Sequence, residues 1–407
     1  MGEGYLAMSE HELGRRRFLK GAAAGLGAVA VGDRAWSQGE LPLIGSSKAD
    51  YSGPNVIIVR FGGGVRRQET ILDPPNTYSP FFLHDLAKRG TLYTNMMISQ
   101  LEGVETNHGQ GTLYILTGKY DKFKDVGGKF LGERFEAQVP TIFEYLRKSF
   151  NVPEHQTLIV NGEDRTDEEF YSFSNHHAFG ASYRSNVLSL YRFKIYLLRR
   201  QIAEGNLDEK AFKQKSAELA KNEALDYRVK DASAQSPEIT AFWERWRRFY
   251  GDSGFVNPRG DRLLTELTLR AMKELRPKML MVNYNDPDYV HWGNASHYTR
   301  GISIIDQGLQ QLFAAVEADE VYRDNTVFVI VPDCGRDSNR ALSVPFQHHS
   351  NTRSSHEIFA LFVGTGIAKG QVIDREVNQI SIAGTVGHII GTETAHTEGP
   401  VLDEVFV

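Results

Sequence analysis

The stretch TVFVIVPDCGRD (residues 326–337) contains the pattern that decides the fold. It begins with a run of β-branched and apolar residues and stops abruptly at Pro332, Asp333 and Cys334. An apolar run without polar alternation is typical of a strand buried on both faces, as in a parallel sheet. The polar residues after it would then lie at the carboxyl end of the strand, where open α/β sheets bind their ligands.

Four other segments repeat this pattern, namely PNVIIVRF (54–61), QTLIVNG (156–162), KMLMVNYND (278–286) and EIFALFVGTG (357–366). Amphipathic segments lie between them, such as PTIFEYLRKSF (140–150) and ISIIDQGLQQLFAAVEAD (302–319). Strands that alternate with helices predict an α/β fold, a three-layer sandwich with a mostly parallel central sheet.

The sequence changes character from about residue 183 to 274, where Lys, Arg and Glu are frequent and no strand pattern occurs. Within it, FWERWRRFYGD places Trp243, Trp246 and Phe249 three residues apart, a spacing that favours packing over ligand binding. We therefore expect a helical insertion packed on the sheet, inside a single domain that spans residues 38–407.

Composition narrows the classes of function. The chain has 407 residues, of which 41% are hydrophobic and 24% charged, so we expect a globular protein. A net charge of −5 gives no bulk attraction toward nucleic acid, and we expect no nucleic-acid partner. Because Cys334 is the one cysteine, an intrachain disulfide and a cysteine-rich zinc site are both excluded. His, Asp and Glu would have to supply most ligands of any metal ion.

The N-terminal segment RRRFLKGAAAGLGAVAVG (15–32), followed by AWS, resembles a twin-arginine export signal in which Arg15 and Arg16 are the arginine pair. Its apolar part is about eight residues shorter than the ~20 that span a bilayer. Residues 1–37 are therefore predicted to be a signal, cleaved after Ser37. The mature chain should have no integral membrane span and should be periplasmic or extracellular, exported already folded.

Three predicted strand ends carry side chains of the kind that bind metal ions. NDPDYVHWG (285–293) follows one strand, PDCGRD (332–337) follows another, and FQHHSNTRSSHE (346–357) precedes the last. Carboxylates and imidazoles brought to one edge of a sheet can converge on a divalent cation. Their candidate ligands are Asp286, Asp288 and His291, then Asp333 and Cys334, then His348, His349 and His356.

The order of these motifs resembles the alkaline phosphatase superfamily, which includes sulfatases, phosphodiesterases and phosphoglycerate mutases. PDYVHWG (287–293) is similar to the family's PDxxGHxxG, with one residue fewer before the His. HSNTRSSHEIFALFVGTGI (349–367) resembles the phosphodiesterase stretch that begins at a late metal-binding His. LTGKY (116–120) is similar to the end of the family's nucleophile helix, and QISIAGTVGHIIG (379–391) to its C-terminal helix.

The resemblance implies that Asp288, His291 and His349 hold one divalent ion, either zinc, calcium or manganese. Asp286 is the alternative to Asp288, because the missing residue leaves the register open. A second ion would use Asp333 and also Cys334, which stands where the family has a His. The first strand ends at three glycines, Gly62 to Gly64, and lacks the Asp that the family has there.

The nucleophile segment departs from the family as well. Counting back from LTG reaches His108, and Thr106 is the nearest hydroxyl. The sequence leaves three readings open: Thr106 as nucleophile, His108 as phosphoryl acceptor or metal ligand, or an anion pocket at a helix N-terminus without a nucleophile. Asn107 and Arg336 are predicted to bind the anionic group of the substrate, and Arg66 and Arg67 are further candidates for this clamp.

Two functions follow from the resemblance. The first is an exported metal-dependent hydrolase of phosphate or sulfate esters, acting on a small-molecule or glycan substrate. The alternative is a catalytically degenerate member that binds an anionic ligand, a glycan or a partner protein. Cys334 is either a thiolate ligand or a buried inert thiol, and the neighbouring motifs favour the second state.

Overall fold

The structure is a computed structural model that describes residues 48–127, 134–163, 165–226, 228, 236–252, 260–291, 294–338, 346–348 and 352–407. The predicted signal at residues 1–37 lies outside the described residues, as does His349. Within the described ranges, no helix combines the length and the apolar character that crossing a membrane requires.

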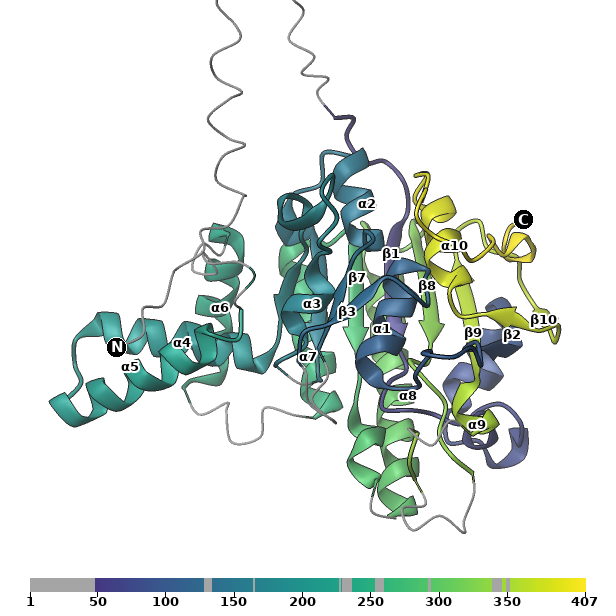
Figure 1. Ribbon diagram of the computed structural model, residues 1–407, viewed down its shortest axis with the longest axis horizontal. Helices are drawn as coiled ribbons and strands as arrows, with labels where there is room; N and C mark the ends of the chain where they lie inside the picture. Colours follow the sequence, from purple (N-terminus) through teal and green to yellow (C-terminus); the bar gives the residue numbers. More distant parts are fainter. Residues whose placement is uncertain are drawn as a thin grey trace, which may run out of the picture. The chain divides into compact units, whose positions relative to one another are not determined.

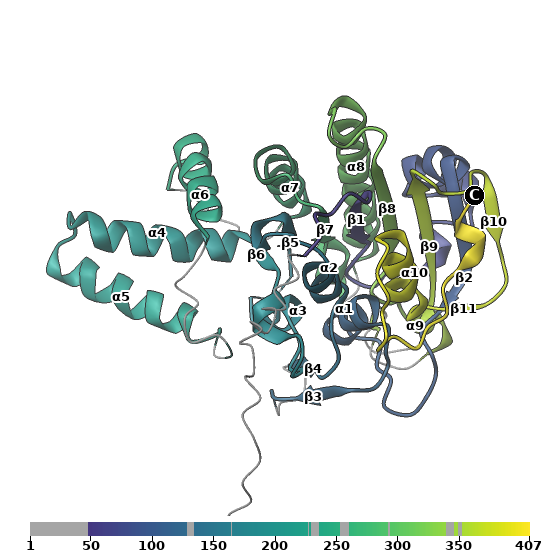
Figure 2. The same ribbon diagram turned by 90° about the horizontal axis from the view of Figure 1, so that it is seen from above.

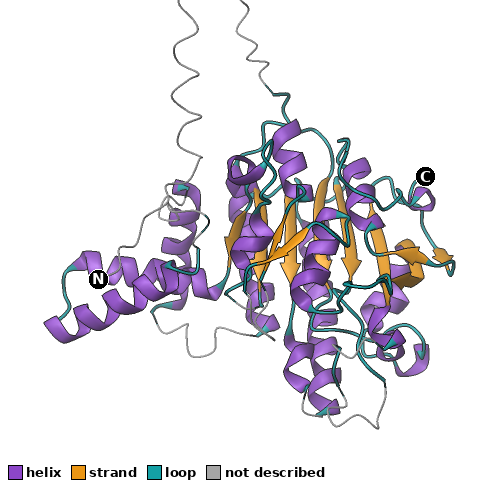
Figure 3. Cartoon of the chain, in the orientation of Figure 1, coloured by secondary structure: helices purple, strands orange, loops and turns teal. Residues whose placement is uncertain are grey.

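The described residues form a nine-stranded sheet with the order β10-β2-β9-β8-β1-β7-β5-β6, in which β11 also pairs with β2 (Figures 1 and 3). β9 runs antiparallel to β2 and β8, whereas the other pairings in this sheet are parallel. A separate antiparallel hairpin pairs β3 (Phe123–Asp125) with β4 (Phe135–Ala137). The sheet strands are β1 (Asn55–Arg60), β2 (Gly90–Met97), β5 (Thr157–Asn161), β6 (Asn186–Leu188), β7 (Met279–Asn283), β8 (Thr326–Val331), β9 (Glu357–Gly364), β10 (Gln371–Ile373) and β11 (Val377–Asn378).

Helices cover both faces of the sheet, which makes three layers and confirms the predicted fold class. Seen from above, α7 and α8 lie on one face, and α1, α2 and α10 lie on the other (Figure 2). The helices are α1 (His108–Thr117), α2 (Ile142–Ser149), α3 (Glu168–Ser172), α4 (Leu190–Glu204), α5 (Glu209–Glu223), α6 (Pro237–Tyr250), α7 (Asp261–Leu275), α8 (Ala295–Ala318), α9 (Arg353–His356) and α10 (Ser381–Ile389).

Each face of the sheet has its own hydrophobic core. Along β1, Ile57 and Val59 point into the core shared with α7 and α8, while Val56 and Ile58 point into the core shared with α1, α2 and α10. Successive side chains of a strand face opposite sides, so a strand buried on both faces must be apolar throughout. This explains why the uninterrupted apolar runs of the sequence mark the central strands correctly.

The helical insertion differs from the prediction in two details. β6 lies within it and pairs with β5 at the edge of the sheet, where a three-residue strand leaves too short a pattern to be recognised. Trp243 and Trp246 are buried as expected, but Phe249 is 67% exposed. A step of six residues turns a helix by about 240° from its start, which carries Phe249 off the buried stripe.

The sheet order brings the chemically interesting strand ends together. β1 lies between β8 and β7, and its last residue, Arg60, is in register with Val331 and Asn283 (Figure 1). The segments that follow these three parallel strands therefore emerge side by side. Because β9 is antiparallel, the segment that precedes it lies at the same end of the strands, next to the carboxyl ends of β1, β7 and β8.

Helix α1 packs closely against the segment after β8, and a glycine makes this approach possible. A Cβ at Gly111 would lie 2.3 Å from the carbonyl oxygen of Asp333, whereas the nearest atom to a Cβ at Gly109 would be 3.6 Å away. The two glycines share one helix but differ in the space around them.

Gly111→Ala should destabilise the protein by about 1–3 kcal/mol, because the added methyl group forces α1 away from Asp333. Gly109→Ala should be neutral or stabilising by up to about 1 kcal/mol, because alanine favours the helix more than glycine does. Chemical denaturation followed by circular dichroism measures both values. Equal stabilities would show that α1 does not approach Asp333 this closely.

Candidate metal centre

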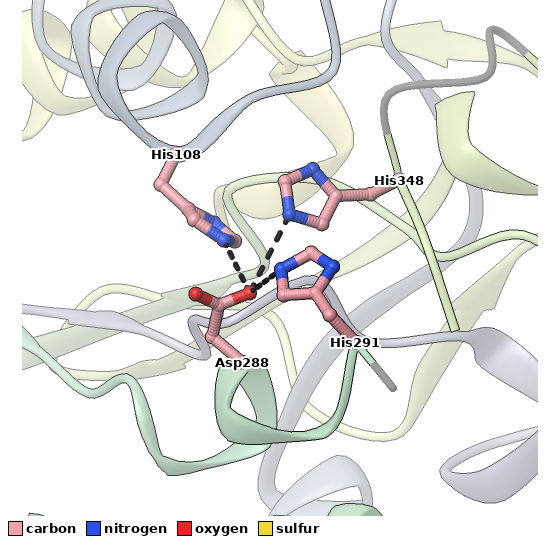
Figure 4. A group of neighbouring side chains, drawn as sticks. All are labelled: His108, Asp288, His291 and His348. Carbon is pink, nitrogen blue, oxygen red and sulfur yellow. Dashed lines mark hydrogen bonds and ion pairs between the residues drawn. The ribbon is translucent and has the colours of Figure 1, made fainter. Parts of the chain in front are cut away.

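Four side chains from three separate parts of the chain converge at this edge of the sheet (Figure 4). His108 is the first residue of α1, Asp288 and His291 belong to the 3-10 turn η7 (Asp286–Val290) and the position after it, and His348 lies before α9. Each offers one ligand atom, and these atoms all lie within 4.8 Å of one another. They form the cluster that we call the central group.

The carboxylate of Asp288 is at the middle of the central group. Its Oδ1 lies 2.7 Å from Nε2 of His291, 2.9 Å from Nε2 of His108 and 3.5 Å from Nε2 of His348 (Figure 4). All three rings thus turn the same nitrogen inward.

The other nitrogen of each ring faces a hydrogen-bond acceptor outside the central group. Nδ1 of His108 lies 2.7 Å from Oδ2 of Asp333, and Nδ1 of His348 lies 2.6 Å from the carbonyl oxygen of Thr106. Nδ1 of His291 lies 3.0 Å from Oε1 of Gln347. An acceptor at Nδ1 keeps the proton of a neutral ring on that atom and directs the lone pair of Nε2 inward.

This pattern is that of histidines that ligate a metal ion, which donate their second N–H to an outer acceptor. Nε2 of His108 is buried and has no hydrogen-bond partner among the described residues, although it lies near Asp288. Three imidazoles and a carboxylate are also a donor set that a divalent transition metal accepts. The residues present therefore fit a metal ion.

The central group is open on one side. The side chains of Asp288 and His291 are 21% and 23% exposed, whereas His348 is fully buried and His108 is 12% exposed. Solvent therefore reaches Asp288 and His291 more than it reaches His108 and His348.

Electrostatics hold the ring of His108 between two carboxylates. Burial lowers the pKa of His108, but Asp288 and Asp333 outweigh burial and raise it well above its ordinary value. Burial would raise the pKa of Asp333, yet His108 and Arg60 hold it well below its usual range. The protein without a metal ion is therefore expected to carry an imidazolium at position 108, flanked by ionised carboxylates.

Asp286, the predicted alternative ligand, has another role. Its Oδ1 accepts a hydrogen bond of 3.2 Å from the backbone N–H of Asp261, the first residue of α7. The carboxylate of Asp261 in turn accepts from the N–H groups of Asn285 and Asp286. Burial and the neighbouring Asp286 raise the pKa of Asp261 to about 8. Asp286 thus joins η7 to α7 and lies outside the central group.

Thr106 is buried, and its hydroxyl is bound to the segment that carries His348. Its hydroxyl donates to the carbonyl oxygen of His348 and lies 3.3 Å from Oγ of Ser355. Asn107 is the N-cap of α1, where its side chain accepts a 2.7 Å hydrogen bond from the N–H of Gln110. Both side chains therefore hold the loop and the helix that carry the imidazoles.

Arg336 lies beside the central group and is bound by the protein itself. Its guanidinium is fully buried and donates to the carbonyl oxygens of Gly63, Gly64 and Phe346. It lies 3.2 Å from Oδ1 of Asp288. The predicted clamp thus secures the glycine loop after β1 against the central group.

The late histidines separate into different roles. His348 supplies the third imidazole of the central group, and His349, which the family resemblance selects, lies outside the described residues. His356 is buried with Nδ1 3.0 Å from the carbonyl oxygen of Ile98, away from the group. The pair His348 and His349 predicts a metal ligand, but the sequence does not decide which of the two rings points into the central group.

Cys334 belongs to a second set of possible ligands, which it forms with His108 and Asp333. Its thiol is fully buried, and burial together with Asp333 raises its pKa to about 12. The thiol is therefore protonated near neutral pH in the protein without a metal ion. Of the two alternatives that the sequence left open for Cys334, a thiolate ligand and an inert thiol, both are compatible with its buried position beside His108 and Asp333.

Comparisons with known proteins identify the fold. No protein-family model matches the chain, and no curated protein matches it in sequence. A solved protein of the alkaline phosphatase superfamily from Vibrio parahaemolyticus is similar in structure, with a TM-score of 0.53, 14% identity and coverage of 88% of this chain and 72% of the other.

A substituted variant of the alkaline phosphatase PafA matches with a TM-score of 0.52 and 11% identity, over 87% of this chain and 99% of the other. A candidate sulfatase from Bacteroides thetaiotaomicron matches with a TM-score of 0.50 and 9% identity, over 86% and 74% of the two chains. At these identities the likeness concerns the fold alone. The chain has the fold of the alkaline phosphatase superfamily, in agreement with the resemblance of its motifs.

His348→Ala should weaken Zn²⁺ binding by more than about 100-fold, because even the outer partners of metal-ligating histidines contribute 10–100-fold to affinity. His297→Ala is the matched control, since His297 is exposed on α8 and lies outside the central group. Isothermal titration calorimetry on the two variants, with folding checked by circular dichroism, measures the difference. Equal affinities would exclude His348 as a ligand.

Proposed function

We propose that the chain is a metal-dependent hydrolase of phosphate or sulfate esters that acts on a small-molecule or glycan substrate. The observation that carries this proposal is the partly exposed convergence of Asp288, His108, His291 and His348 on one point. It occurs beyond the strand ends of a sheet whose solved relatives include an alkaline phosphatase and a candidate sulfatase. Open α/β sheets bind their ligands in this place.

The donor set favours zinc among the ions that the sequence leaves open. Calcium takes oxygen ligands almost exclusively, and manganese sites are rich in carboxylates and water. Three imidazoles and one carboxylate are typical ligands of zinc. A zinc ion held by these residues would supply positive charge to an ester oxygen.

We further propose that hydrolysis proceeds without a covalent ester on a hydroxyl of the enzyme. The residue of the first turn of α1 that belongs to the central group is His108, which has no hydroxyl. The hydroxyl of Thr106 is bound to the loop of His348. Covalent catalysis requires an activated nucleophile within reach of the reacting atom. Direct attack by water needs no such side chain and is compatible with the residues present.

One observation favours the alternative, a protein that binds an anionic ligand, a glycan or a partner protein without turnover. The central group offers four possible protein ligands, which is the number that structural zinc sites use. A catalytic ion would have to accept a fifth ligand from the exposed side. Metal content and turnover, measured together, distinguish the two functions.

Asp288→Asn should abolish both metal binding and hydrolysis of aryl phosphate, phosphodiester or sulfate substrates, with a loss in kcat/KM of roughly 100-fold or more. Asp286→Asn, two residues away on η7, should retain activity, because Asp286 lies outside the central group. Release of the aryl alcohol is followed by absorbance in the zinc-loaded proteins. Bound zinc without turnover on any ester would establish the binding function instead, and failure to bind any metal would overturn both functions.

We also propose export by the twin-arginine route, on the basis of the pattern at residues 15–20. Replacement of Arg15 and Arg16 together by Lys should leave the unprocessed protein in the cytoplasm of a bacterial host. Arg17→Lys is the matched control and should be exported, since position 17 is the variable residue of the pattern. Fractionation followed by immunoblotting measures the outcome. Equal export of both variants would contradict the proposal.

A further inference from the structure

We infer that the centre holds one divalent ion, and that His108, Asp333 and Cys334 do not form a second metal site. Backbone N–H groups and side chains of the protein occupy the place of a second ion. They also compensate the negative charge of Asp333 that would attract one. This inference deepens the proposed function and rests on metal binding by the central group. It assigns Arg60, a residue without a role so far, to the positioning of His108.

The two possible sets of ligands share a single ring. His108 directs Nε2 to Asp288, at 2.9 Å, and Nδ1 to Asp333, at 2.7 Å. If Nδ1–H donates to Asp333, only Nε2 remains for a metal ion. Asp333 is then an outer partner that orients a ligand, in the arrangement that metal-bound histidines commonly have.

The carboxylate of Asp333 has no lone pair left for an ion. It accepts from the backbone N–H groups of Cys334 at 2.8 Å, Gly64 at 3.2 Å and Gly63 at 3.4 Å. The ring of His108 is its fourth donor. A carboxylate offers about four lone-pair sites, and these contacts use them all.

The loop after β1 is built to supply two of these donors. Gly63 and Gly64 have φ angles of +82° and +68°, in the left-handed region that favours glycine. A Cβ at Gly63 would lie 2.6 Å from the backbone nitrogen of Asp288, and one at Gly64 would lie 2.9 Å from the carbonyl oxygen of Gly335. Successive N–H groups in such a turn make a concave site for an anion, here the carboxylate of Asp333.

Arg60 adds a permanent positive charge at the same place. It is the last residue of β1 and is fully buried, and its Nη1 lies 3.7 Å from Oδ2 of Asp333. The same nitrogen lies 2.5 Å from Oε2 of Glu163 and 2.6 Å from Oγ1 of Thr112. A guanidinium with these partners is fixed, and it would repel a second divalent ion next to Asp333.

The arrangement links Arg60 to His108 by a second route. Thr112, which accepts from Arg60, donates a 2.7 Å hydrogen bond from its hydroxyl to the carbonyl oxygen of His108. Arg60 therefore contacts both the acceptor on the ring of His108 and the helix turn that carries it. Arg60 is therefore a positioning residue. It acts on His108 through Asp333 and Thr112 and touches no atom of the central group directly.

The test is the number and the environment of the bound ions in the purified mature protein. After loading with Zn²⁺ and removal of excess metal, elemental analysis should find one ion per chain. The Co²⁺-loaded protein should lack the charge-transfer band of a thiolate ligand, and Cys334→Ala should change neither the stoichiometry nor the spectrum. Two ions per chain, or a thiolate band that Cys334→Ala removes, would overturn the inference.

Asp333→Asn tests whether Asp333 orients the ring of His108 or binds a metal ion itself. The variant should still bind one Zn²⁺ per chain, with an affinity lower by about 10–100-fold, because an outer partner is removed and no ligand is lost. A fall from two ions to one would identify Asp333 as a ligand and contradict the inference. Should this variant fail to fold, the stoichiometry of the unsubstituted protein and of Cys334→Ala still decides the question.

These outcomes separate the inference from the proposed function. One ion without turnover on any ester would overturn the hydrolase and leave the single-ion centre intact. Two ions with turnover would overturn the single-ion centre and leave the hydrolase intact. A protein that binds no ion would overturn both.

Discussion

The contact between Asp333 and His108 is the constraint on which the rest of the site depends. It joins the end of the central strand β8 to the first turn of α1, and it turns the ring of His108 so that Nε2 faces Asp288. A buried carboxylate is stable only when its charge is compensated and its lone pairs are used. The glycine loop after β1 and the guanidinium of Arg60 serve this requirement, and Gly111 lets α1 approach the backbone of Asp333.

The same requirement explains how the chain departs from the family that it resembles. The first strand ends in Arg60 and glycines, where the resemblance leads us to expect a metal-binding Asp, and α1 begins with His108, where it leads us to expect a nucleophile. In the structure the two differences meet at one residue, because Gly64 and His108 both contact the carboxylate of Asp333. A carboxylate that is neutralised by Arg60 and bound to the glycine loop can orient an imidazole, and an imidazole in the first turn of α1 completes the central group.

Much of the fold follows from sequence patterns because burial on both faces demands uninterrupted apolar strands. The five predicted strands, the amphipathic α2 and α8 and the helix closed at Leu116 to Gly118 were all confirmed. Among the described residues, six strands escaped prediction, namely β2, β3, β4, β6, β10 and β11, and all of them except β2 have only two or three residues. β2, with the sequence GTLYTNMM, mixes polar residues into its run.

The sequence by itself determined the fold class, and it placed Asp288 and His291 among the candidate ligands after one strand, with Asp286 as the alternative to Asp288. Only the tertiary structure decided that His348 points inward, that Asp286 binds α7, and that Thr106 and Arg336 support the loops. The physical reason is that loops have no periodicity, so the direction of their side chains depends on neighbours distant in sequence. Arg60 shows this best: it ends an apolar strand, and only the adjacency of β8 and β1 brings its charge to Asp333.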